Sequence, residues 1–218
     1  MKNLIFKEDV DVVVAYKQQN IAMKDFVNSL QEYFNDNQEL KPIYDLDLLC
    51  GGIVVCARNE QAYNNLKEAY CKNKFEFDFY AVTVGTPKFD SGTYSAHVTF
   101  DKKYNKLTHI PQLNAGAEGF GLTYATLERV QQIALVDIKL NTFIPETIRF
   151  AMADLGMPIF GDAVYGGDSL AKNTNTAFVL GKVRIVEGEG DEGGQTFVAM
   201  PPSSKPWTYF DLTKISKL

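Results

Sequence analysis

The chain has 218 residues, of which 45% are hydrophobic and 22% are charged, and its formal net charge is -5. This length fits one domain or two closely fused lobes, and the composition is typical of a folded globular protein rather than a disordered or collagen-like one. The acidic balance argues against a general nucleic-acid coat protein, which needs a basic surface to contact phosphates. A local basic patch on the surface would still be compatible with this acidic net charge.

The cysteine and histidine content excludes further classes of protein. Cys50, Cys56 and Cys71 are an odd number without a C-x-x-C pair, so neither a disulfide framework nor a structural zinc site is expected. His97 and His109 have no partner at a metal-ligand spacing. No apolar run is long enough to span a membrane, and charges come too early for a signal peptide. We therefore expect a cytoplasmic protein that uses no metal and no organic cofactor.

The hydrophobic pattern predicts strands and helices in chain order, with strands predominating later. A β-branched run at 10–14 predicts a strand, and apolar residues at helical spacing predict a helix over 24–34. Phe75, Phe77 and Phe79 alternate with acidic residues, which indicates a strand whose first part has one wet face. Further strands are predicted at 53–57, 75–84, 94–100, 122–127, 134–140, 159–165, 178–186 and 196–200, and further helices at 59–70 and 145–155. Most connections are too short for parallel crossovers, so a largely antiparallel sheet is expected.

One acidic segment carries the first sign of a known family. Read alone, residues 44–52 are an acidic turn before a buried strand. The stretch from Tyr44 to Asn59 also resembles the catalytic motif of the RluA-type pseudouridine synthases, in which His-Arg-Leu-Asp leads into a small-residue turn, an aliphatic strand and a helix. This resemblance implies that Asp47 is the catalytic aspartate.

Other blocks resemble the same family in the same order. Residues 13–17 resemble its first strand with the Asn-Lys-Pro ending, and residues 78–82 resemble the segment with a Tyr two residues before an Ala. The strongest block, 140–167, contains Ile-Arg, then Gly-x-Pro-Ile-x-Gly-Asp, then Tyr-Gly. Together with the late segment 197–201, the resemblance covers nearly the whole chain.

The chain departs from the family pattern around the implied site. Tyr44 and Asp45 replace the His and Arg that precede the catalytic aspartate, and Phe79 stands where the family has a Tyr facing the base. Residues 143–147 replace the family's Gly-Arg-Thr-His-Gln. The small N-terminal RNA-binding domain common in relatives is expected to be absent, because the first core strand comes so early.

The resemblance assigns roles to three residues. Asp47 would act as the nucleophile at the sugar carbon or as the base that takes a sugar proton. Arg149 would face it and keep it ionised, since a neighbouring arginine lowers an Asp pKa by about 1 to 3 units. Without the family, Arg149 is interpreted as a surface i, i+3 partner of Glu146. Phe79 would stack on the target base, or is simply one of the alternating core aromatics.

Asp45 fits the resemblance poorly. It lies two positions from Asp47, which would put both carboxylates on the same side of an extended strand, where like charge raises the pKa of one of them and repels RNA phosphate. A glycosidase with Asp45 and Asp47 as its paired carboxylates is a further hypothesis, beside a merely solvated acidic turn.

The sequence thus predicts an α+β, pseudouridine-synthase-like fold, with a largely antiparallel mixed sheet and few flanking helices, as a single catalytic domain over residues 1–218. The resemblance implies an RNA pseudouridine synthase acting as a monomer on a uridine flipped out of structured rRNA or tRNA, with no role for DNA or membranes. The alternative is a catalytically silent RNA-binding or interaction module. RNA binding is expected to use a local patch drawn from Lys72, Lys74, Lys102, Lys103 and Lys106.

Overall fold

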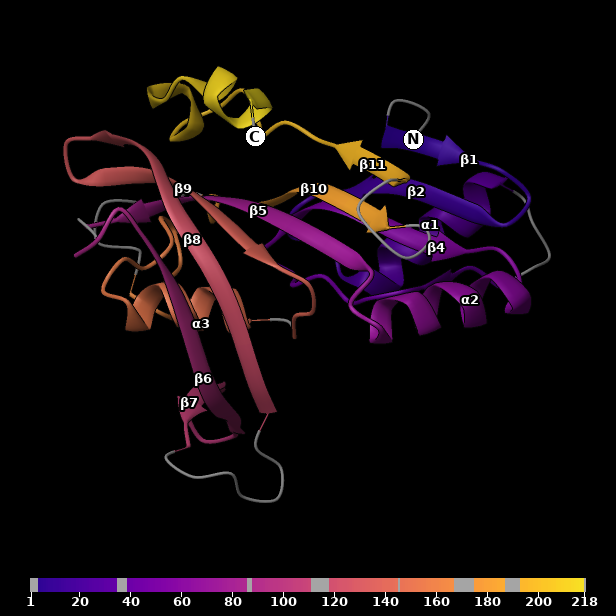
Figure 1. Cartoon of the computed structure of the whole chain (residues 1–218), viewed down its shortest axis with the longest axis horizontal. Helices are drawn as coiled ribbons and strands as arrows, with labels where there is room; N and C mark the ends of the chain where they lie inside the picture. The colour runs from indigo at the N-terminus through magenta and orange to yellow at the C-terminus, as the bar shows by residue number, and fades with distance from the viewer. Residues whose placement is uncertain are drawn as a thin grey trace. The chain divides into compact units, whose positions relative to one another are not determined.

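The computed structural model describes residues 4–34, 39–85, 88–110, 118–144, 146–166, 175–186 and 193–217. The chain forms two compact units (Figure 1). The first consists of Met1–Asp78 and Val179–Ala199, and the second of Phe79–Phe178 and Met200–Leu218. No helix in the described ranges is both long enough and apolar enough to cross a membrane.

In its described residues, the first unit consists of a mixed sheet and two α-helices. Its central strand, β4, pairs antiparallel with β2 and parallel with β10, while β1 pairs with β2 and β11 pairs with β10, both antiparallel. Helix α1 buries Phe26 and Leu30 against this unit. The elements are β1 (Ile5–Glu8), β2 (Val12–Lys17), α1 (Met23–Phe34), β3 (Lys41–Pro42), β4 (Gly51–Ala57), α2 (Glu60–Cys71), the start of β5 (Phe75–Val84), β10 (Phe178–Val186) and β11 (Gly194–Val198).

Strand β4 is buried along its whole length. Such burial on both faces requires an uninterrupted apolar run, which Gly51–Ala57 supplies. The parallel pairing places Gly52 opposite Leu180 of β10, and Gly52 has a φ of 145°. A Cβ at Gly52 would lie 2.5 Å from the Leu180 carbonyl oxygen. Only glycine allows the two strands to approach this closely.

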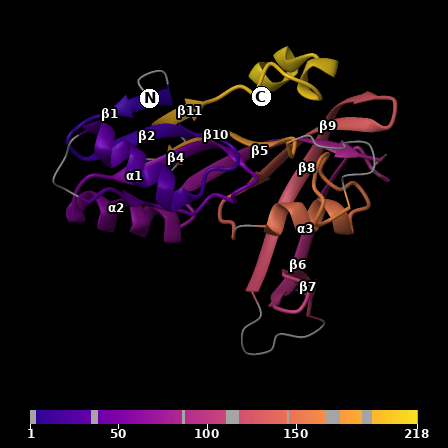
Figure 2. The same cartoon turned by 180° about the vertical axis from the view of Figure 1, so that it is seen from behind.

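In its described residues, the second unit contains a run of paired strands and one α-helix. Within it the strands follow the order β5, β9, β8, β6, β7. The long β6 and β8 pair along much of their length toward the turn that joins β6 to β7 (Figures 1 and 2). The elements are β6 (Ser91–Asp101), β7 (Lys106–His109), β8 (Glu118–Val130), β9 (Ile133–Leu140), α3 (Thr147–Asp154) and the 3-10 helices η2 (Trp207–Tyr209) and η3 (Leu212–Lys217).

Most predicted elements are confirmed, including the antiparallel character of the sheet and the α+β class. The predicted strands at 75–84 and 178–186 match β5 and β10 residue for residue. Helix α3 begins at Thr147, and Gly156 follows it with a φ of 76°, as expected of a C-terminal stop. Pro145, predicted in the first turn of that helix, lies outside the described residues.

The strand predicted at 159–165 is wrong. Only Ile159 forms a bridge, to Thr83, and the backbone then turns. Gly161 has a φ of 84°, and a Cβ there would lie 2.7 Å from the carbonyl oxygen of Asn175. The apolar pattern of the segment therefore reflects a tightly packed turn rather than a strand. The short strands β1 and β7 were not predicted, because each has only four residues and takes its stability from the strand it pairs with.

The wet face expected at the start of β5 is also wrong for Asp78. Its side chain is 7% exposed and lies 3.4 Å from the ammonium of Lys182 on β10. The alternation in the sequence predicts that Asp78 faces solvent, but β10 lies beside β5 and its Lys182 lies next to this side chain. The alternation of Phe75, Phe77 and Phe79 does reflect burial, as all three rings are buried.

We predict that Gly52→Ala destabilises the protein by about 3 kcal/mol or more, because the new Cβ meets backbone atoms and the φ is unfavourable for any other residue. Gly121→Ala in β8 is the matched control, since its nearest neighbouring atom would lie 3.7 Å away. Urea unfolding of both variants measures the difference. Equal stability of the two variants would contradict the close approach of β4 and β10.

Candidate active site

Asp47 lies in a turn that its own side chain stabilises. The segment 43–50 links β3 to β4 and contains no strand. One carboxylate oxygen of Asp47, Oδ1, accepts a hydrogen bond from the backbone N–H of Leu49 at 2.7 Å, and its carbonyl accepts one from the N–H of Cys50 at 3.0 Å. Asp47 is only 8% exposed. The local sequence therefore fixes a nearly buried carboxylate directly before the central strand.

The loop that follows β2 holds the same turn from the other side. The side-chain amide of Gln19 donates to the Leu49 carbonyl at 2.7 Å, and the backbone N–H of Asn20 donates to the Leu48 carbonyl at 2.8 Å. Gln19 and Leu49 are 30 positions apart in the chain, so these bonds connect two segments that are distant in the sequence. The Asp47 turn is thus held by its own hydrogen bonds and by the loop after β2.

Lys17 is a buried cation close to this turn. It is 0% exposed, and its ammonium donates to the Ile21 carbonyl at 3.0 Å and to the Gln18 carbonyl at 3.3 Å. Burial lowers the pKa of Lys17, while the nearby Cys50 thiol and then the carboxylates of Asp47 and Asp45 act in the opposite direction. Lys17 therefore lies within electrostatic reach of both acids.

Sequence reasoning did not single out Lys17 as part of the site. The available signal was its position, a charged residue at the end of the apolar strand Val12–Lys17. A lysine there is normally expected to reach solvent, so its complete burial could only be seen in the folded chain.

Asp45 and Asp47 are coupled, although the extended strand assumed for them is absent. Asp45 is exposed whereas Asp47 is buried. Partial burial raises the pKa of Asp45, and the negative charge of Asp47 raises it further, while a hydrogen bond from Leu46 and the charge of Lys17 lower it. The charge of Asp47 thus contributes to the raised pKa of Asp45, but burial is its main cause.

Arg149 is buried on α3, with 3% of its side chain exposed. Its Nε and Nη2 donate to the two oxygens of Asp162 at 2.7 and 3.0 Å, a bidentate ion pair. Its Nη1 lies 3.4 Å from Glu146, and its guanidinium stacks 5.2 Å from the ring centre of Tyr165. The Glu146 contact was anticipated, but a surface position for Arg149 is wrong.

Asp162 is the anchor of this cluster. It is 0% exposed, and its Oδ1 also accepts the backbone N–H groups of Val164 and Tyr165 at 2.9 and 3.2 Å. The Tyr165 hydroxyl in turn accepts the N–H of Leu107 on β7 at 2.9 Å. The Gly-Asp and Tyr-Gly parts of the sequence block therefore hold the guanidinium of Arg149 in one orientation. Asp47 belongs to the first unit and Arg149 to the second, so their pairing stays a prediction.

Phe79 lies in an aromatic cluster of the second unit. The side chain is 1% exposed, its ring stacks on Phe178 with centroids 5.3 Å apart, and Phe143 meets it edge-on at 5.1 Å. One face of the ring is thus occupied by Phe178. With 1% of Phe79 exposed, the packing supports a core role, and substrate binding by Phe79 stays a prediction.

The predicted lysine patch draws on both units. Lys72 lies just after α2 and pairs with Glu68, whereas Lys102, Lys103 and Lys106 lie at the turn between β6 and β7. Lys103 lies over the ring of Tyr104, which is 60% exposed, and Phe100 is 47% exposed. The β6–β7 turn therefore combines exposed lysines with exposed aromatic rings.

We predict that Asp162→Ala lowers the free energy of unfolding by about 3 to 5 kcal/mol, because it leaves the buried Arg149 charge uncompensated. Glu146→Ala is the control: its side chain is 26% exposed and its contact with Arg149 is longer, at 3.4 Å, so the expected loss is below about 1 kcal/mol. Chemical denaturation of both variants measures this. Similar losses for the two would show that Asp162 is not the anchor.

No family model matches the sequence. The chain is 28% identical over 135 residues to an uncharacterized RNA pseudouridine synthase of Chlorobaculum parvum, covering 61% of this chain and 41% of that protein. It is also 28% identical over 161 residues to the ribosomal large subunit pseudouridine synthase C of Rickettsia bellii, covering 70% of this chain and 51% of that protein. The chain spans about half the length of these curated relatives.

The fold comparison points the same way. The solved structure of human RNA pseudouridylate synthase domain containing 4 superposes with a TM-score of 0.75 at 16% sequence identity, covering 93% of this chain and 90% of that chain. The pseudouridine-synthase-like α+β fold is therefore confirmed, as is the resemblance in sequence to RNA pseudouridine synthases.

Proposed function

We propose that this chain, a relative of the RNA pseudouridine synthases with the pseudouridine synthase fold, isomerises a uridine in structured RNA to pseudouridine. The observation that carries the proposal is the Asp47 turn, which presents a fixed and nearly buried carboxylate with Lys17 in electrostatic range. We propose further that the two units act together as one catalytic domain over residues 1–218, as a monomer in the cytoplasm. The free thiols of Cys50 and Cys56 are compatible with a reducing compartment.

The proposed reaction exchanges one bond for another within a single nucleotide. The bond between the base nitrogen N1 and the sugar carbon C1′ breaks, the base turns, and a bond between C5 and C1′ forms. The proton leaves C5 and one is gained at N1, so the atoms balance without a co-reactant. Asp47 would act at the sugar, either as the nucleophile at carbon or as the base that takes a proton.

In this proposal the Arg149 guanidinium faces the Asp47 carboxylate. The positive charge would offset the cost of holding the carboxylate's negative charge away from water. The bidentate bond to Asp162 would then fix the angle at which Arg149 meets Asp47.

The proposed activity is tested in cells that lack the gene. We expect rRNA or tRNA from these cells to lose a specific pseudouridine, which the intact gene restores and the Asp47→Asn variant does not. Asp25→Asn, at an exposed acid on α1, is the control and should restore the modification fully. An unchanged pseudouridine map in the deletion strain would contradict the proposed function, and RNA binding without turnover would favour a silent module.

The β6–β7 turn is proposed to contact the RNA backbone. Reversing the charges of Lys102, Lys103 and Lys106 together should weaken RNA binding and reduce the slope of log affinity against log salt by about 2 to 3, because each phosphate contact contributes roughly 0.9. Lys88→Glu is the control at an exposed lysine outside this turn. Fluorescence anisotropy over a salt series measures the slope, and an unchanged slope would remove this turn from the RNA-binding surface.

Phe79→Tyr tests whether the ring faces the target base. The added hydroxyl could assist proton removal from the base carbon, so the single-turnover rate should rise while RNA affinity stays nearly unchanged. Phe79→Ala should weaken RNA binding by about 1 to 3 kcal/mol if stacking occurs. If instead both variants only lower the melting temperature and leave rate and affinity unchanged, Phe79 is a core residue alone. Circular dichroism melting of each variant separates the two outcomes.

A further inference from the structure

The hairpin of β6 and β7 in the second unit is positively charged, although the protein is acidic. Strand β6 pairs with β8 through Val98, and its last residues pair only with β7 in the described part of the chain (Figures 1 and 2). Residues 98–110 contain three lysines and one acid, a formal charge of +2 with histidine neutral, against -5 for the whole chain. Within the described residues, the ammonium groups of these lysines make no ion pair. The lysines are Lys102, Lys103 and Lys106.

The acids found at this hairpin have partners of their own. Asp101 holds the turn, because its Oδ1 accepts the backbone N–H groups of Lys103 and Tyr104 at 2.8 and 3.3 Å. Asp154 of α3 contacts the opposite end of β7, where it lies 3.0 Å from His109. The turn is therefore an ordered one, and its lysines are presented from a fixed backbone.

One aromatic ring of the hairpin extends past the residues that cover its apolar face. Phe100 lies directly opposite Leu107 and two positions from Val98, so the three side chains share a face. Val98 and Leu107 are 1% and 8% exposed and pack with Phe150 and Tyr165. Phe100 lies outside that cluster and is 47% exposed. The apolar face of the hairpin thus ends in an uncovered ring.

Tyr104 supplies a second exposed ring in the turn itself. It is 60% exposed, and the ammonium of Lys103 lies 4.9 Å from its ring centre. The turn therefore combines exposed rings with ammonium groups, as a nucleotide combines a flat base with a phosphate. Base stacking on aromatic rings, with cations along the backbone, is how proteins hold single-stranded nucleic acid.

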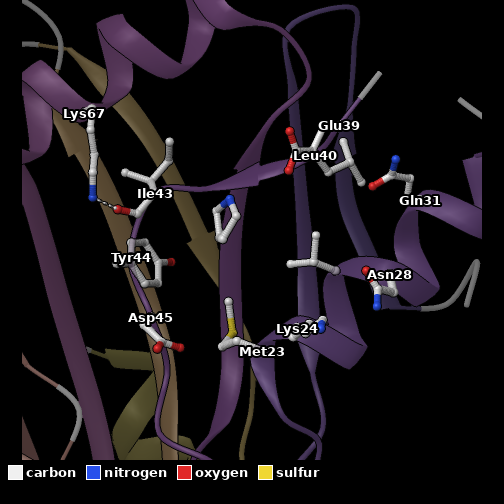
Figure 3. A pocket seen from close by; sticks show the side chains of 12 residues that line it. Met23, Lys24, Asn28, Gln31, Glu39, Leu40, Ile43, Tyr44, Asp45 and Lys67 are labelled. Atoms are coloured by element: carbon white, nitrogen blue, oxygen red, sulfur yellow. Dashed lines mark hydrogen bonds between the residues drawn. The ribbon is translucent and has the colours of Figure 1, made fainter. Parts of the chain in front are cut away.

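The cavity of the first unit has no comparable preference. It has a volume of about 500 Å³ and lies beside the Asp47 turn, with Lys67 and Asp45 on one side and Lys24 of α1 on the other (Figure 3). Glu39 also lines it, so two lysines face two acids. The ammonium of Lys67 already donates to the Ile43 carbonyl at 2.7 Å. The charges of this cavity therefore select neither an anion nor a cation.

We propose that the β6–β7 turn binds unpaired RNA nucleotides, with Phe100 and Tyr104 stacking on bases and the three lysines contacting the flanking phosphates. This deepens the proposed function and rests on it. In duplex RNA the faces of the bases are covered by neighbouring base pairs, so a duplex offers this turn only its phosphates. The substrate class is then RNA with a loop, a bulge or a single-stranded end where the turn binds.

The probe is a fluorescein-labelled RNA of about 12 nucleotides, within the range of single-strand site sizes, either alone or annealed to its complement. Anisotropy over a salt series gives the affinity of the full chain for each form. We expect the single strand to bind about fivefold or more tightly than the duplex, because each stacked base contributes at least this factor.

Phe100→Ala and Tyr104→Ala should each lower single-strand affinity by about fivefold or more, and should leave duplex affinity unchanged. The slope of log affinity against log salt should also stay unchanged, because stacking releases no counterions. Tyr104→Phe retains the ring and should retain the affinity. These results would separate the rings from the lysines, whose charge reversal changes the slope.

Phe89→Ala is the matched control. Phe89 is 62% exposed, and the ammonium of Lys88 lies 5.5 Å from its ring centre, but it lies outside the hairpin. Its removal should change neither affinity. Circular dichroism melting of each variant confirms that the fold is retained.

Four results would overturn the proposal. One is equal affinity of the native chain for the single strand and the duplex. Another is an equal loss of both affinities in the ring variants, which would mean that the rings only order the turn. The third is a dimer in light scattering that Phe100→Ala disrupts without changing RNA affinity, since the uncovered face would then contact a second copy of the chain. The fourth is the absence of binding by either form of the probe.

The outcome is separable from that of the proposed activity. A single-strand preference that depends on Phe100 and Tyr104, in a protein whose deletion leaves cellular pseudouridine unchanged, would support the binding surface and reject the activity. A pseudouridine lost on deletion, together with ring variants that bind both forms of the probe as the native chain does, would support the activity and reject the binding surface.

Discussion

The buried ion pair between Arg149 and Asp162 is the interaction on which the second unit's part of the site depends. A guanidinium removed from water is tolerated only when a carboxylate and other partners satisfy it, and Asp162 supplies both oxygens. The same carboxylate holds the turn at 162–165 through backbone N–H groups, and Tyr165 links that turn to β7. One buried charge thus joins α3, the following turn and a strand.

The first unit shows the same constraint at Lys17. Its ammonium is completely buried and donates hydrogen bonds to carbonyl oxygens of the loop that also holds the Asp47 turn through Gln19 and Asn20. Asp47 and Asp45 add negative charge nearby. The geometry of the candidate carboxylate is therefore tied to the end of β2, a segment more than two dozen residues earlier in the chain.

The structure shows what Tyr44 and Asp45, which depart from the family pattern, do in this chain. Tyr44 is buried, donates its hydroxyl to the Ile53 carbonyl at 3.0 Å and packs edge-on against Phe77, so it serves the core of the first unit. Asp45 is exposed and lines a cavity. Where the family has charged residues before its catalytic aspartate, this chain has Tyr44, which packs in the core, and Asp45, which lines the cavity.

The sequence by itself determined the elements with strong periodicity, such as β5, β10 and α3, because a long apolar repeat leaves one way to bury it. The sequence also contains the motifs that resemble those of the RluA-type pseudouridine synthases, and Asp47 and Arg149 belong to these motifs. Only the tertiary structure decided that 159–165 is a turn, that Asp78 is covered and that Lys17 is buried. These outcomes depend on which distant segment supplies a partner: Asn175 beside Gly161, Lys182 beside Asp78, and the Ile21 carbonyl for Lys17. A local pattern of apolar and polar residues contains no information about such partners.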